Sequence, residues 1–261
     1  MKIIDGGVTA AKGFKAAGMH AGIKKGTKKD MAMIVSSAPC MAAGTFTTNL
    51  VKAAPVKWDQ HVVYEHGEAR AVVVNSGIAN ACTGAEGYGY CEETAKAAAE
   101  ALGIDKDEVL VASTGVIGKQ LPIDTIKKGV KDLSGLLLDT REAATLAAES
   151  IMTTDTVKKE VAVEVEIGGK TVTIGGMCKG SGMIHPNMCT MLSFLMTDAA
   201  ISKEMLQKAL SADVDDTYNM ISVDGDTSTN DTVLLLANGL AENPEITEEG
   251  EDYQTFARAL H

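Results

Sequence analysis

Residues 161–174 read VAVEVEIGGKTVTI, and this stretch decides the class of fold. From 161 to 167 apolar and polar side chains alternate, as they do on a strand with one buried face. Gly168 and Gly169 follow, and residues 171–174 alternate again. Two such runs around a glycine pair predict a β-hairpin. The short apolar run 190–196 predicts a buried strand shortly after it.

Strands and amphipathic helices alternate on both sides of this hairpin. Further strands are predicted at 71–74, 109–112 and 233–237. Helices are predicted at 84–103, from Pro122 to about Leu133, from Asp139 or Thr140 to about Met152, after the cap Ser202, and from Tyr253 to the end. The apolar stripe of the last helix needs a partner, either elsewhere in the chain or in a continuation past His261. This pattern predicts an α/β layered sandwich, of α+β type with mixed sheets.

Composition narrows the possible partners and the cellular location. The 261 residues carry a formal charge of −11, which disfavours nucleic acid as a partner. The first residues contain no continuous apolar stretch of the kind found in a secretory leader, and the sequence has no apolar run of roughly 20 residues, so we expect a cytoplasmic protein without a membrane partner. The five cysteines are scattered, and no pair has C-x-x-C spacing, so we expect them to be reduced. The five histidines lack metal-ligand spacing, and we expect no metal site.

Three polar segments are candidates for chemistry. Residues 180–190 form a glycine-rich loop that leads into an apolar strand, so the hydroxyl of Thr190 would lie at the mouth of a core. Thr114 and Gly115 follow a strand and could present a hydroxyl and an N–H together, as an oxyanion hole requires. Residues 153–156 form a polar cluster after a helix. Each also has an ordinary interpretation as a β-former, a turn or a cap, and the residues alone leave both open.

Two further signals in the same region are weaker. Lys179 precedes Gly180 and Ser181, but the spacing of a phosphate-binding loop is absent. His185 could act as a general base, although a single histidine without a partner is more often structural. The sequence does not settle the role of His185 or that of Cys189.

The chain resembles the ornithine acetyltransferase family, whose members are also called bifunctional glutamate N-acetyltransferases. The strongest match is residues 176–192 (GMCKGSGMIHPNMCTML), which resemble the segment where these enzymes cleave themselves. Further matches stand in the family's order at 39–49 (PCMAAGTFTTN), 75–84 (NSGIANACTG), 113–118 (STGVIG), 152–156 (MTTDT) and 224–231 (DGDTSTND). Related N-terminal-nucleophile aminopeptidases are expected to share the fold.

The resemblance implies a self-processing acyltransferase of arginine biosynthesis. Cleavage between Cys189 and Thr190 would divide the chain into an α chain, 1–189, and the start of a β chain, 190–261. Thr190 would then carry an acetyl group from N-acetylornithine to glutamate by a ping-pong mechanism. Thr114 and Gly115 would hold the oxyanion, and Thr153 and Lys179 would contact substrate together with Thr190.

The resemblance also implies partners and leaves some questions open. We expect small-molecule substrates, no cofactor, and an assembly of two α and two β chains after cleavage. Acetyl-CoA donates acetyl groups in some family members, and no residue here separates those members from the others. The scissile bond follows Cys189, where the family usually has alanine.

Family members also continue well past the position of His261, in a tail that supplies substrate-binding residues. We therefore expect a chain that lacks the family's C-terminal part. Two alternative hypotheses remain: a related amidase or aminopeptidase that uses water as acceptor, and a truncated fragment without activity.

Overall fold

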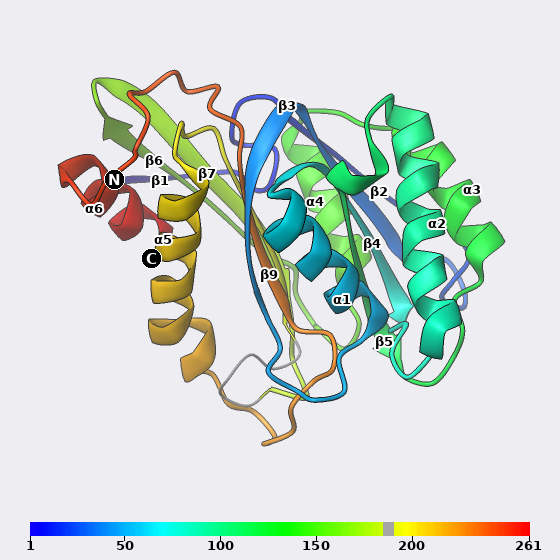
Figure 1. The fold of residues 1–261 in the computed structure, drawn as a ribbon. Coiled ribbons are helices and arrows are strands. Elements are labelled where there is room, and N and C mark those ends of the chain that lie inside the picture. Colours follow the sequence, from blue (N-terminus) through cyan, green and yellow to red (C-terminus); the bar gives the residue numbers. More distant parts are fainter. Residues whose placement is uncertain (185–190) are drawn as a thin grey trace.

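The computed structural model describes residues 1–184 and 191–261, in which nine strands form one mixed sheet (Figure 1). The strands are β1 (Lys2–Ile4), β2 (Phe14–Met19), β3 (Met31–Phe46), β4 (Glu68–Ile78), β5 (Val109–Val116), β6 (Lys159–Ile167), β7 (Lys170–Lys179), β8 (Leu192–Thr197) and β9 (Thr232–Ala237). Their order across the sheet is β1-β6-β7-β8-β9-β3-β4-β5, and β2 pairs with β3.

The helices cover the sheet on both sides. They are α1 (Ala54–His61), α2 (Gly84–Leu102), α3 (Ile123–Ser134), α4 (Arg141–Ile151), α5 (Lys203–Asp216) and α6 (Glu251–Leu260). Figure 1 shows α5 and α6 on one side of the sheet and α2 and α3 on the other. The predicted α/β sandwich with mixed sheets is confirmed.

The hairpin that opened the sequence analysis is present as β6 and β7. Its strands pair antiparallel with Ile167 opposite Lys170, so Gly168 and Gly169 make the turn. Both glycines have positive φ, which residues with a Cβ rarely adopt. The next strand, β8, pairs antiparallel with β7 and parallel with β9.

Helix ends agree with the signals read from the sequence. The Thr140 hydroxyl accepts a hydrogen bond from the N–H of Ala143 at the start of α4, and Ser202 does the same for Met205 in α5. Gly103 ends α2 in the left-handed conformation. The stripe of α6 finds its partner within the chain, because α6 packs against α5 and β6 with Tyr253 buried.

Local sequence patterns did not predict the longest strand, β3, nor β1, β2 and α1. β3 pairs with β4 between Met31 and Val35, and its register shifts before Cys40. Cys40 and Met41 still pair with β4, and from Met41 to Phe46 β3 pairs with β9. The shift lies around Pro39, which has no N–H to donate to a ladder. β3 therefore belongs to both halves of the sheet and bends between them.

Hydrophobic side chains fill both faces of the sheet. Alternate residues of β9 belong to two different clusters, Leu234 and Leu236 to one and Val233 and Leu235 to the other. A strand buried on both faces has a continuous apolar sequence, as residues 233–237 do. Within the described residues no helix has the length and apolar character needed to span a bilayer.

Replacing Leu234 by Ala is expected to lower the free energy of unfolding by about 2–5 kcal/mol, because the core around β9 cannot close the cavity fully. Leu234 is 0% exposed, whereas Leu50 is 100% exposed. Leu50→Ala removes the same atoms and should stay within about 0.5 kcal/mol. Chemical denaturation measures both, and equal losses would contradict the burial of β9.

Candidate functional site

A large open cavity lies where β4, β5 and β7 end. It has a volume of about 1560 Å³. Four residues singled out from the sequence, Thr114, Gly115, Thr153 and Lys179, line it together. They come from positions up to 65 residues apart in the chain, as the Thr114–Lys179 contact shows. The structure thus brings residues 153–156, the end of β5 and the described start of the 180–190 segment to one place.

Thr114 and Gly115 stand at the end of β5, which runs parallel to β4. Thr114 pairs with Ser76, and Gly115 pairs with Gly77. Gly115 has φ +132°, and a Cβ there would lie 2.3 Å from the carbonyl carbon of Gly77. Only glycine fits this conformation and this close approach, so the backbone requires glycine at position 115.

A buried polar network holds the end of β5 against β4 and the segment before β9. The Ser113 hydroxyl donates to Asn75 Oδ1 at 2.6 Å. The Asn230 amide donates to the carbonyl oxygen of Ala79 at 2.6 Å and to that of Ser113 at 2.8 Å. Because these groups are buried, losing one partner leaves another polar atom unsatisfied. The network therefore fixes the position of Thr114 and Gly115.

Lys179 is the last residue of β7 and is only 2% exposed. Its Nζ donates to the Thr114 hydroxyl at 3.4 Å, a long hydrogen bond. Burial lowers the pKa of Lys179, although Asp155 and Asp231 oppose this effect. Lys179 forms no ion pair with a carboxylate among the residues described. A buried ammonium without an ion-pair partner is a natural receptor for an anionic ligand.

Thr153 is held in the wall of the cavity by Asp155. The Asp155 carboxylate accepts the N–H of Thr153 at 3.2 Å and the N–H of Gly180 at 2.8 Å, and it pairs with Lys159 at 2.6 Å. Burial acts to raise the pKa of Asp155, but these hydrogen bonds lower it overall. Asp155 thereby ties the segment after α4 to the end of β7 next to Lys179.

Two aspartates hold the residues on either side of 185–190. Asp224 accepts the N–H of Ile184 at 2.9 Å and also that of Met183. Asp231 accepts the N–H of Met191 at 2.8 Å. The predicted nucleophile Thr190, the predicted cleavage residue Cys189 and the candidate base His185 lie outside the described residues.

Several residues that shape this site could not be recognised from the sequence. Asp155 and Asp231 fall within quoted motifs, but only the structure shows which N–H groups their carboxylates accept. Lys24 also lines the cavity, and its sequence context of several lysines gave no signal. In the described part of the chain, no group of three or more His, Cys, Asp or Glu side chains is placed to hold a metal ion.

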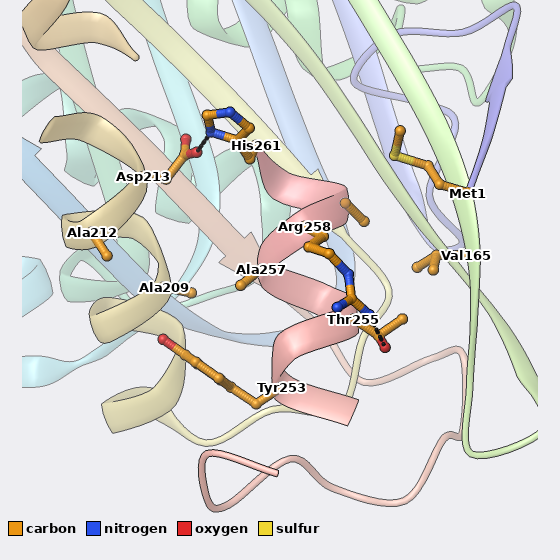
Figure 2. A pocket seen from close by; sticks show the side chains of 11 residues that line it. Met1, Val165, Ala209, Ala212, Asp213, Tyr253, Thr255, Ala257, Arg258 and His261 are labelled. Carbon is orange, nitrogen blue, oxygen red and sulfur yellow. Dashed lines mark hydrogen bonds and ion pairs between the residues drawn. The ribbon is translucent and has the colours of Figure 1, made fainter. Parts of the chain in front are cut away.

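A second hollow lies between α5, α6 and the start of the chain (Figure 2). Its volume is about 630 Å³, and it contains none of the site residues predicted from the sequence. His261 Nδ1 lies 3.1 Å from Asp213 Oδ1 at one end of it, within hydrogen-bond distance. Apolar side chains make up much of its lining, so it lacks the convergent polar groups of the larger cavity.

Comparison with known proteins identifies the family. The family model described as "ArgJ family" matches residues 15–261. The chain belongs to the ArgJ family. It is 55% identical to the arginine biosynthesis bifunctional protein ArgJ of Symbiobacterium thermophilum, covering 100% of this chain and 64% of that protein. It is 53% identical to ArgJ 1 of Clostridium acetobutylicum, covering 97% and 62%. The chain thus spans less than two thirds of these ArgJ relatives.

Solved structures agree with this assignment. An ArgJ crystal structure from Bacillus halodurans matches with TM-score 0.68 and 45% identity, over 74% of this chain and 97% of that chain. The ornithine acetyltransferase of Mycobacterium tuberculosis, solved with ornithine, matches with TM-score 0.65 and 42% identity, over 71% and 97%. An aminopeptidase of Ochrobactrum anthropi, described as a variant of the Ntn hydrolase fold, shares the fold at 12% identity and TM-score 0.54.

Asp231 makes a testable contribution to the pH dependence of stability. Burial raises its pKa to about 7, although the N–H of Met191, Ser228 and Lys179 oppose the shift. In the unfolded chain an aspartate titrates near 3.9, so the folded protein retains a proton that the unfolded chain has lost between these values. The protonated Asp231 therefore stabilises the folded protein fully below about pH 4, and this contribution to the unfolding free energy is lost as the pH rises toward 7.

Asn cannot ionise, so Asp231→Asn should not lose unfolding free energy as the pH rises. The variant still has an oxygen to accept the N–H of Met191. Between pH 5 and pH 8 the unfolding free energy of the variant, relative to wild type, should rise by about 2–3 kcal/mol. Denaturation at both pH values measures it. The exposed Asp139→Asn serves as control and should show no such change. A parallel pH response of Asp231→Asn and wild type would refute the buried titration.

Proposed function

We propose that the whole protein transfers an acetyl group from N-acetylornithine to glutamate through Thr190. The observation that carries this proposal is the meeting of Thr114, Gly115, Thr153 and Lys179 in one cavity. Asp231, whose charge acts on Lys179, holds the residue that follows Thr190 in the chain. The family supports the choice of reaction, because the relatives are named as bifunctional proteins of arginine biosynthesis.

The first proposed step is self-cleavage before Thr190. The Thr190 hydroxyl attacks the carbonyl of Cys189, the amide nitrogen leaves as an amine, and the Cys189 acyl group moves to the oxygen. Water then hydrolyses this ester and frees Thr190 as a new N-terminus. Residues 1–189 and 190–261 become separate chains. In the Bacillus structure 97% of the crystallised chain matches 74% of this chain, an extent similar to that of residues 1–189.

The second proposed step uses the new terminus. An α-amino group has a pKa of roughly 7.7–8.0, so it can accept a proton near neutral pH. Thr190 Oγ attacks the acetyl carbonyl of N-acetylornithine while its own amine takes the proton. The Thr114 hydroxyl and the Gly115 N–H stabilise the oxyanion. Ornithine leaves with the proton, and the acetyl group remains on Thr190 as an ester.

The third proposed step regenerates the enzyme. The α-amine of glutamate attacks the acetyl ester, Thr190 Oγ regains a proton, and N-acetylglutamate leaves. Lys179 and Thr153 orient the amino acid, with Lys179 opposite its α-carboxylate. Acetyl-CoA is a possible second donor, no cofactor is required, and two α and two β chains assemble after cleavage.

Cleavage is tested by mass measurement under denaturing conditions. The purified protein is expected to give two chains that correspond to 1–189 and 190–261. Thr190→Ala should give one intact chain, because no hydroxyl remains to attack. Thr190→Ser retains the hydroxyl and should still cleave, which makes it the matched control. An intact wild-type chain, or cleavage that persists in Thr190→Ala, would refute the proposal.

Acetyl transfer is tested with N-acetylornithine and glutamate. Thr114→Val keeps the shape of the side chain but removes one oxyanion donor, so kcat should fall by roughly 10²–10³-fold. The assay uses protein whose cleavage has been checked by mass, so that a loss of activity is not a loss of processing. Release of acetate without N-acetylglutamate would favour a hydrolase, and a cleaved but inactive protein would favour an incomplete site.

A further inference from the structure

The loop between β2 and β3 is fixed by one buried carboxylate. Asp30 is 0% exposed. It accepts the backbone N–H groups of Ala21 at 2.6 Å, Ile23 at 2.7 Å and Lys24 at 2.8 Å. Hydrogen bonds to a buried charged group are among the stronger ones in proteins. The backbone of Lys24 therefore has a defined position at the edge of the cavity.

The side chain of Lys24 is held as firmly as its backbone. Its Nζ donates to the carbonyl oxygen of Met152 at 2.6 Å and to that of Lys29 at 2.9 Å. An ammonium group has three donors, so one donor remains for another acceptor. Both partners are neutral carbonyls, and Lys24 forms no ion pair within the described ranges. Its neighbours Lys25 and Lys28 are exposed on the same loop and add positive charge at the cavity entrance.

Lys24 and Lys179 line the same cavity, and among the residues described neither forms an ion pair with the carboxylates nearby. Burial lowers the pKa of Lys24 to about 8. Asp30 and Asp155 oppose this, and the positive charges of Lys28 and Lys179 add to it. The positive charge of Lys179 thus disfavours the charged form of Lys24. An anion bound between them would relieve both the burial and the repulsion.

We propose that Lys24 is the specificity-determining residue that binds the side-chain carboxylate of a dicarboxylic amino acid acceptor. The identity of the acceptor as glutamate rests on the proposed function. Lys179 contacts Thr114, at the proposed oxyanion site, so the α-carboxylate beside the reacting amine belongs at Lys179. Lys24 contacts the carbonyl of Met152, next to Thr153, and so lies on the wall that the longer end of glutamate would reach.

Lys24 would distinguish glutamate from ornithine by the charge of their side chains. Glutamate carries a second carboxylate, whereas ornithine carries a side-chain ammonium that Lys24 would repel. Ornithine must therefore direct its side chain elsewhere, and the cavity offers Glu149, Asp155 and Asp224 for this. Glutamine matches glutamate in shape but lacks the second charge. The comparison of glutamate with glutamine thus isolates the contribution of Lys24.

The test measures dissociation constants by calorimetry for glutamate and glutamine. Wild type should bind glutamate about tenfold or more tightly than glutamine. Lys24→Met should reduce this preference to within about twofold, while Lys24→Arg, which keeps the charge, should retain most of it. Lys25→Met is the matched control, because an exposed charge at the entrance should change the preference by less than about threefold.

The pH profile distinguishes binding from a structural role. The wild-type preference for glutamate should decline as the pH rises through about 8, where Lys24 loses its proton. Lys179 faces the α-carboxylate that both ligands share, so its titration cancels in the ratio. Lys24→Arg should keep the preference at pH 9.5, because arginine stays charged.

Several outcomes would overturn the proposal. These are a wild type without preference for glutamate, a folded Lys24→Met variant that retains the preference, or an equal loss of affinity for both amino acids. Circular dichroism checks the fold of each variant. If wild type prefers glutamate through Lys24 but transfers no acetyl group, the proposed function fails and this inference stands.

Discussion

The bend in β3 is the constraint on which the site depends. β3 spans Met31 to Phe46, and 16 residues of straight strand would extend roughly 50 Å. Its first half pairs with β4, and its last residues pair with β9. A straight β3 would therefore place the ends of β4 and β5 far from the start of β9. Instead, Asn230 before β9 donates to Ser113 in β5 at 2.8 Å. The bend around Pro39 brings these ends together.

Local patterns predicted the helices and the hairpin, because capping residues, glycines and periodicity act over a few neighbours. Thr140, Ser202 and Gly103 each stand where the structure uses them. β3 could not be found this way, since the serines and Pro39 in its centre have the composition of a turn. Its continuity depends on strands that follow much later in the chain. The family motifs pointed to four residues that line one cavity in the structure, but not to the contacts between them.

The sequence also does not show which of two neighbouring lysines takes part in the site. Lys24 and Lys25 are adjacent and chemically identical, and the sequence offers no reason to separate them. The carboxylate of Asp30 fixes the loop so that Lys24 points its Nζ at the carbonyl of Met152 while Lys25 stays exposed. A chain with formal charge −11 thereby gathers ammonium groups around one cavity. Local charge, and not net charge, determines which ligands such a cavity favours.

The same strand pairing determines what cleavage before Thr190 would do. Residues 190–261 contribute β8 and β9, which pair with β7 and β3 from the other piece. Asp224 from the second piece accepts the N–H of Ile184 in the first piece. Buried side chains from both pieces, including Phe194 and Met177, belong to one hydrophobic cluster. Cutting one peptide bond removes none of these interactions, so the two chains would stay together, and a new N-terminus would form without separation of the halves of the site.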